Sequence, residues 1–179
     1  MSGTAILVID MQQALVEGAY RQNALVDAVN GLIRRARQSG VPVIFVQHNH
    51  ATFEAMKRGA PGWEIFRGLD RRPQDEVVEK TASDAFYDTD LQARLEAVGV
   101  DHLIVTGLQT EYCVDTTCRA ALSRDLDVTL VADGHSTGDA RMSAADIVAH
   151  HNALLANVVH PRSRIQVFPA SEVAFGDES

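Results

Sequence analysis

The chain has 179 residues, of which 46% are hydrophobic and 22% charged, and its formal net charge at pH 7 is −8. This length and composition are typical of a globular protein with a buried core, and we predict one domain over residues 1–179. The negative charge argues against general binding to nucleic acid or to an anionic membrane. The apolar run 5–9 is too short to span a bilayer and lacks the features of a secretion signal. Two cysteines imply no disulfide framework, so we expect a cytoplasmic protein.

Short apolar runs alternate along the chain with amphipathic, helix-like patterns. In chain order we expect a strand at 5–10, a helix at 23–40, strands at 41–47 and 76–80, a helix at 88–99, a strand at 102–107, a helix at 111–125, a strand at 127–133, a helix at 143–157 and a strand at 164–168. This alternation indicates right-handed βαβ crossovers. The predicted fold is therefore α/β, a three-layer, doubly wound, Rossmann-like arrangement with a mainly parallel sheet of about six strands. The segment 48–75 interrupts the alternation, and long loops of this kind are often functional.

Polar residues stand where several of the predicted strands end. Asp10 ends the first strand, His48 follows the second, Lys80 ends the strand at 76–80, and Cys113 follows the strand at 102–107. In an open parallel sheet these positions share one edge, where ligands bind. Asp10, Lys80 and Cys113 would together suit acyl transfer, with Asp10 as general base and Cys113 as nucleophile.

Cys113 stands at the predicted start of a helix, where unpaired N–H groups supply positive potential. This potential, together with the ammonium of Lys80, would favour a reactive thiolate well below pH 8. The same N–H groups could hold the oxyanion formed when the sulfur attacks a carbonyl. The alternative is that Cys113 only packs the helix against the sheet. Cys118, further along the helix, is expected to be such a packing residue.

The seven histidines do not form a recognisable metal motif. His48 and His50 stand two apart at a strand end, and His150 and His151 are adjacent on a predicted helix, so neither pair converges on one point. No carboxylate accompanies either pair at ligand spacing. We therefore predict no metal, and because no phosphate-binding glycine motif is present, no nucleotide cofactor. His48 is expected to line the substrate pocket instead.

Three segments resemble the isochorismatase-like cysteine hydrolases, a family that includes nicotinamidases and N-carbamoylsarcosine amidohydrolase. They are "AILVIDMQ", "EKTASDAF" and "VTGLQTEYCVDTTCRAA", and the resemblance extends over nearly the whole chain. It implies that Asp10, Lys80 and Cys113 are the catalytic residues and that Phe86 is a pocket aromatic. It also implies a cis peptide bond between Leu108 and Gln109, so that the N–H groups of Gln109 and Cys113 form the oxyanion hole.

The chain departs from two branches of this family. Nicotinamidases carry an Asp-x-His…His metal cluster after the second strand, and "FVQHNH" lacks the aspartate. True isochorismatases lack the cysteine. The resemblance therefore implies a metal-independent hydrolase of a small-molecule amide or carbamoyl C–N bond, acting through a thioester. A non-catalytic or redox-sensing member and a metal-assisted nicotinamidase remain open as alternatives.

The expected partner is a small-molecule substrate. The pocket walls are expected to come from the segment 48–68, with Trp63 as a candidate, and from Phe86 and Tyr112. Trp63 could equally pack in an interface between subunits. The family commonly forms oligomers, so the resemblance implies a homodimer or homotetramer.

Overall fold

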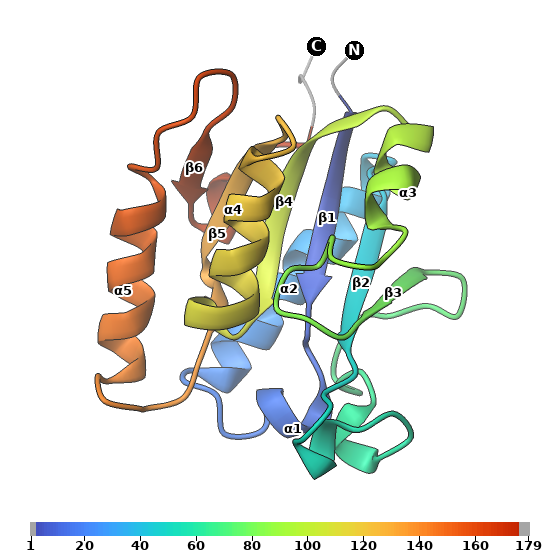
Figure 1. Ribbon diagram of the computed structural model, residues 1–179, viewed down its shortest axis with the longest axis vertical. Coiled ribbons are helices and arrows are strands. Elements are labelled where there is room, and N and C mark those ends of the chain that lie inside the picture. Colours follow the sequence, from blue (N-terminus) through green and yellow to red (C-terminus); the bar gives the residue numbers. More distant parts are fainter. Residues whose placement is uncertain (1–2, 176–179) are drawn as a thin grey trace.

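The computed structural model of the protein describes residues 3–175. Within these residues, one six-stranded sheet has the order β3-β2-β1-β4-β5-β6, and every neighbouring pair is parallel (Figure 1). The strands are β1 (Gly3–Ile9), β2 (Val43–His48), β3 (Glu76–Lys80), β4 (Val100–Leu108), β5 (Asp127–Ser136) and β6 (Ile165–Phe168). The predicted doubly wound α/β fold is confirmed. The strand order reverses between β1 and β4, so a ligand site is expected at their C-terminal ends.

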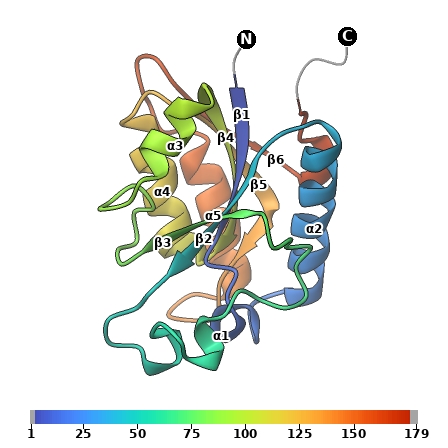
Figure 2. The ribbon, with the colours of Figure 1, turned by 90° about the vertical axis from the view of Figure 1, so that its right-hand side faces the viewer.

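Helices cover both faces of the sheet, which gives the three predicted layers. The helix α2 (Gln22–Gln38) lies on one face, and α3 (Leu91–Ala97), α4 (Asp115–Leu122) and α5 (Ala144–Leu155) lie on the other (Figure 2). A short helix, α1 (Gln13–Val16), lies beyond the C-terminal end of β1. The four longer helices correspond to the four predicted from the sequence. The turn α1 was not predicted, because four residues are too few for a helical period to be visible.

The sheet separates two hydrophobic cores, and β1 contributes to both. Ala5, Leu7 and Ile9 pack in the core beneath α3, α4 and α5, whereas Ile6 and Val8 pack in the core beneath α2. Successive side chains of a strand point to opposite faces, so a strand covered on both faces needs an unbroken apolar run. Each fully buried aliphatic side chain stabilises the fold by about 1.5–3 kcal/mol.

The end of β4 lies unusually close to the end of β1, and Gly107 makes this approach possible. A Cβ atom at Gly107 would stand 1.9 Å from the carbonyl oxygen of Ile9, and the residue has φ 122°, which side chains rarely allow. Asp10, the residue after β1, and Gln109, the residue after β4, line the same cavity at this edge. The glycine therefore helps to build the edge at which the site lies.

The long segment after β2 forms the predicted excursion and covers part of this edge. It contains the 3₁₀ turns η1 (Glu54–Met56) and η2 (Pro61–Trp63), and Ile65 bridges to Gln12 beside α1. Backbone hydrogen bonds tie it to the start of α1, including one from Gln13 N–H to the Glu64 carbonyl. The excursion is thus fixed against the C-terminal edge of the sheet.

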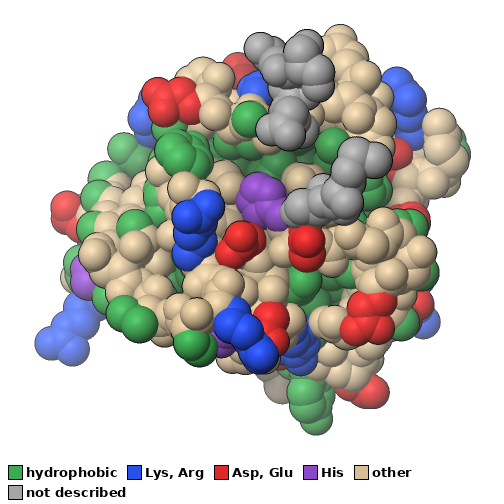
Figure 3. Space-filling view, turned by 90° about the horizontal axis from the view of Figure 1, so that it is seen from above, with side chains coloured by type: hydrophobic (Ala, Val, Ile, Leu, Met, Phe, Trp, Pro, Cys, Tyr) green, Lys and Arg blue, Asp and Glu red, His purple; other side chains and the backbone are tan. Residues whose placement is uncertain are grey.

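Acidic and basic side chains are interspersed on the face at the N-terminal edge of the strands (Figure 3). Among the described residues, none of the helices has the length and apolar character needed to cross a membrane.

Candidate active site

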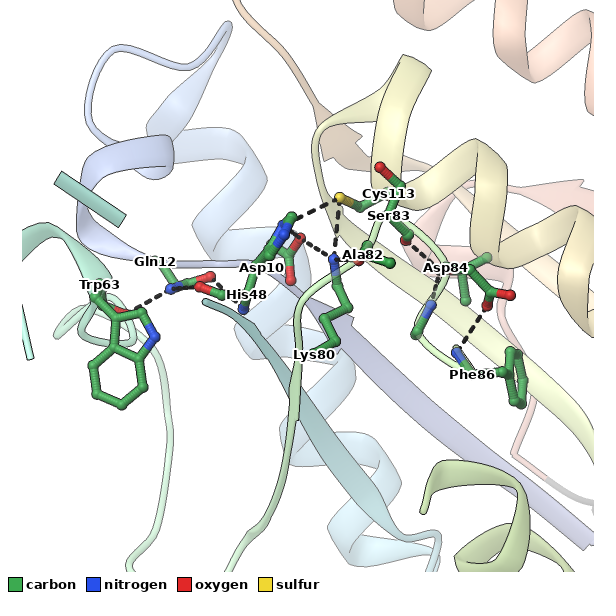
Figure 4. A network of polar contacts seen from close by, with 12 residues as sticks. Asp10, Gln12, His48, Trp63, Lys80, Ala82, Ser83, Asp84, Phe86 and Cys113 are labelled. Carbon is green, nitrogen blue, oxygen red and sulfur yellow. Dashed lines mark hydrogen bonds and ion pairs between the residues drawn. The ribbon is translucent and has the colours of Figure 1, made fainter. Parts of the chain in front are cut away.

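The side chain of Lys80 joins Asp10 and Cys113 at the C-terminal edge of the sheet. Its Nζ lies 2.8 Å from Oδ2 of Asp10 and donates hydrogen bonds to the Cys113 Sγ at 3.2 Å and to the Ala82 carbonyl at 2.8 Å. The ammonium therefore makes two hydrogen bonds and one ion pair. Figure 4 shows Lys80 directed between the carboxylate and the sulfur. The structure thus brings together the three residues that the sequence singled out.

The Asp10–Lys80 ion pair is completely buried, with both side chains 0% exposed. Removing two charges from water costs several kcal/mol per ion, so a buried pair is a poor way to gain stability. Neither carboxylate oxygen of Asp10 accepts a hydrogen bond from the described residues, although Oδ2 forms the ion pair with Lys80. Asp10 also has φ 49°, in the left-handed region that few side chains adopt. A costly, strained and incompletely bonded carboxylate indicates a role in chemistry.

Cys113 lies in a π-helical turn, η3 (Thr110–Val114), that precedes α4. The predicted helix starts in the right place, but its first turn is wider than an α-helix. The Gln109 carbonyl accepts hydrogen bonds from the N–H groups of both Tyr112 and Val114. Turns of this kind occur often at functional sites. The peptide bond between Leu108 and Gln109, directly before the turn, is cis.

The surroundings of Cys113 favour the thiol over the thiolate, whereas the positive groups considered in the sequence favoured the thiolate. Burial first, and then the negative charge of Asp10, raise its pKa to about 12, although Lys80 acts in the opposite direction. The difference arises because Cys113 is only 6% exposed and the carboxylate of Asp10 lies nearby. A base must therefore remove the proton when the sulfur attacks. The Asp10 carboxylate, within 4.8 Å of the sulfur, is placed to do so.

His48, which the sequence placed at the same edge, contacts both of these groups. Its Nδ1 lies 3.5 Å from Oδ2 of Asp10 and 3.8 Å from the Cys113 Sγ. The fully buried amide of Gln12 holds the His48 backbone, because its Oε1 accepts from the His48 N–H and its Nε2 donates to the His48 carbonyl. Sequence reasoning missed Gln12. The available signal was a polar residue two positions after Asp10 in "AILVIDMQ".

A cavity of about 450 Å³ opens beside these groups. Of the predicted substrate-binding residues, His48 and Tyr112 line it, as does Gln109. The residues of its wall are Asp10, Ala14, Leu15, His48, His50, Phe53, Met56, Ser83, Gln109, Tyr112 and Cys113. Phe53 and Tyr112 are about half exposed, which places two aromatic rings where a ligand could enter.

Two predicted substrate-binding residues lie away from this cavity (Figure 4). The Trp63 carbonyl accepts hydrogen bonds from the side chains of Gln12 and Gln47, and Trp63 lines a separate cavity. Phe86 packs in the core with Arg124 stacked 4.4 Å above its ring. Trp63 therefore supports the wall through its backbone, and Phe86 supports the fold. The prediction that both line the substrate pocket is not matched by their positions.

Asp10, His48 and Cys113 together offer a donor set for a metal ion. Their ligand atoms all lie within 4.8 Å of one another, and carboxylate, imidazole and thiolate are the ligands that zinc prefers. The ammonium of Lys80, however, lies 2.8 Å from Asp10 and 3.2 Å from the sulfur, where it would repel a divalent cation. The residues present therefore fit a metal poorly.

Comparisons with known proteins agree with this geometry. The family model described as the isochorismatase domain matches residues 4–160. A streptothricin hydrolase from Streptomyces noursei is 39% identical over 138 residues, which cover 75% of this chain and 50% of the relative, so the chain spans about half the length of that protein. A crystal structure of an isochorismatase family protein is 35% identical, with a TM-score of 0.81 and coverage of 91% of this chain and 97% of the other. The N-carbamoylsarcosine amidase of Thermoplasma acidophilum is 25% identical, with a TM-score of 0.77 and coverage of 96% and 98%. The chain belongs to the isochorismatase family.

Proposed function

We propose that the protein hydrolyses an amide or carbamoyl C–N bond of a small molecule through a thioester on Cys113, without a metal. The observation that carries this proposal is the buried ammonium of Lys80, 2.8 Å from Asp10 and 3.2 Å from the sulfur, beside a cavity of about 450 Å³. The names of the relatives, a hydrolase and an amidase, support the same class of reaction.

In the first half-reaction, the sulfur of Cys113 bonds to the substrate carbonyl carbon while Asp10 accepts the thiol proton. The carbonyl electron pair moves to the oxygen, and the N–H groups of Gln109 and Cys113 hold the oxyanion. Collapse of this intermediate breaks the C–N bond, and Asp10 gives its proton to the leaving nitrogen. Ammonia or an amine departs and a thioester remains.

In the second half-reaction, water attacks the thioester and Asp10 accepts a proton from it. Collapse releases the acid, and Cys113 regains its proton. The ammonium of Lys80 lies beside both groups, so it stabilises each state in which Asp10 or the sulfur is negative. His48 faces both groups and is proposed to contact the substrate.

A screen of small amides, ureides and carbamoyl compounds tests the proposal. We expect release of ammonia or an amine from at least one compound, and loss of that activity when iodoacetamide alkylates Cys113. A substrate should protect the enzyme from alkylation, because it occupies the same cavity. If the protein turns over no compound of these classes, a non-catalytic or redox-sensing role is favoured instead.

Removal of metals should leave the activity unchanged. The ammonium beside Asp10 and Cys113 takes the place of a cation, so dialysis against EDTA is expected to change kcat/KM by less than about twofold. Added zinc is the complementary measurement. Loss of activity on chelation, restored by zinc, would contradict the metal-independent mechanism and favour a metal-assisted enzyme.

A further inference from the structure

A chain of buried and partly buried hydrogen bonds runs from the nucleophile turn to α5. Thr110 Oγ1 lies 2.8 Å from His135 Nδ1, and His135 Nε2 lies 2.8 Å from Asn152 Oδ1. Asn152 Nδ2 then donates to the Ala132 carbonyl at 3.1 Å. Thr110 is 0% and His135 3% exposed, so the bond between them is shielded from solvent, whereas the bonds of Asn152 are partly buried. The proposed mechanism uses none of these residues.

The direction of each bond follows from the position of Asn152. Its NH₂ group is engaged with the Ala132 carbonyl, so its oxygen faces His135 and must accept the Nε2 proton. Burial lowers the pKa of His135 to about 4, so the ring is neutral at physiological pH. A neutral ring with its proton on Nε2 has a free lone pair on Nδ1. His135 therefore accepts the hydroxyl proton of Thr110.

This bond fixes the residue between the two proposed oxyanion donors. Thr110 follows Gln109 directly and begins the turn that contains Cys113. A second bond, from the Thr137 hydroxyl to Glu111 Oε1 at 2.9 Å, ties the next residue of the turn to the end of β5. The side chains of Thr110 and Glu111 are thus held by His135 and Thr137, which lie at the C-terminal end of β5 and just beyond it.

We propose that His135, oriented by Asn152, is a positioning residue that holds the Gln109–Cys113 turn in its reactive geometry through Thr110. The proposal rests on the proposed function, because the turn supplies both the nucleophile and the oxyanion donors. Preorganised donors act when they stand about 2.7–3.1 Å from the position of the developing charge, so a small displacement of the turn lowers the rate. The histidine therefore acts on the rate and not on substrate affinity.

Removal of the Thr110 hydroxyl tests this role. Thr110→Val keeps the shape but cannot donate, and we expect kcat to fall about 10- to 100-fold with KM changed by less than about twofold. Thr110→Ser restores the donor and should recover kcat to within about threefold of the wild type. An unchanged kcat in Thr110→Val, or no recovery in Thr110→Ser, would overturn the proposal.

The chain offers a matched control in a second threonine–histidine pair. Thr129 Oγ1 lies 2.9 Å from Nε2 of His102, and this pair stands near the opposite edge of the sheet from Cys113. Thr129→Val should reduce stability as Thr110→Val does, but leave kcat unchanged. Equal losses of kcat in the two variants would mean that only stability is involved.

A measurement without substrate separates this proposal from the proposed function. Amide hydrogen exchange should become faster at residues 110–114 in Thr110→Val, and not in Thr129→Val, because the turn opens more readily without its tether. Long-range ¹H–¹⁵N NMR should show the His135 proton on Nε2. If the wild type hydrolyses no amide but both results hold, the proposed function fails and the tether stands. Unchanged exchange, or a proton on Nδ1, would overturn the tether itself.

Discussion

Replacement of Cys113 by alanine is expected to abolish amide hydrolysis and leave the fold intact. The variant keeps the carboxylate, the ammonium and the cavity, but it has no atom that can form the thioester. We expect kcat to fall by a factor of about 10⁴ or more, since the other groups of such a site act through the nucleophile. The measurement is product release at saturating substrate, with circular dichroism and urea unfolding as evidence of folding.

Cys118 provides the matched control for this substitution. It is 0% exposed, packs in the core beneath α4, and burial raises the pKa of its thiol. Cys118→Ala should lose about 1 kcal/mol of stability and retain full activity. Retained hydrolysis in Cys113→Ala would refute the thioester mechanism. Loss of hydrolysis in both variants would attribute the effect to packing.

Much of the site was predictable because strand ends are visible in a sequence. Asp10 and Cys113 come after unbroken apolar runs, Lys80 ends a short strand, and a parallel sheet brings such ends to one edge. The sequence placed His48 at this edge as well, but its direct contacts with Asp10 and Cys113 could not be predicted from strand ends. These contacts depend on the register of β2 against its neighbouring strands and on the Gln12 amide that holds the His48 backbone.

Other features depend on packing that no local pattern encodes. The high pKa of Cys113 results from burial and from a carboxylate that is distant in sequence, whereas the prediction considered only the positive groups. Trp63 belongs to an excursion without helical or strand periodicity, so the direction of its ring was not predictable. The cytoplasmic location, the single domain over 1–179 and the homodimer or homotetramer stay predictions.

Replacement of Asp10 by asparagine is expected to change two properties of Cys113 in opposite directions. Without the general base, we expect kcat to fall about 10²- to 10⁴-fold. Without the nearby negative charge, the pKa of Cys113 should fall, because Asp10 raises it and Lys80 lowers it. Iodoacetamide should therefore alkylate Cys113 faster than in the wild type at pH 8, while hydrolysis becomes slower. A site that required only a reactive thiolate would gain activity from the same change.

A second ion pair serves as a control that separates the loss of stability in Asp10→Asn from its effects on kcat and on alkylation. Asp10→Asn leaves the buried ammonium of Lys80 without its counter-charge, and breaking such a pair costs about 3–5 kcal/mol. Asp75→Asn breaks the mostly buried pair between Asp75 and Arg37, away from the cavity, and should change neither kcat nor the alkylation rate. Slower alkylation in Asp10→Asn would contradict the assignment, because Asp10 would then favour the thiolate. Faster alkylation of Cys113 together with loss of turnover in Asp10→Asn is the result expected if Asp10 is the base that removes the thiol proton.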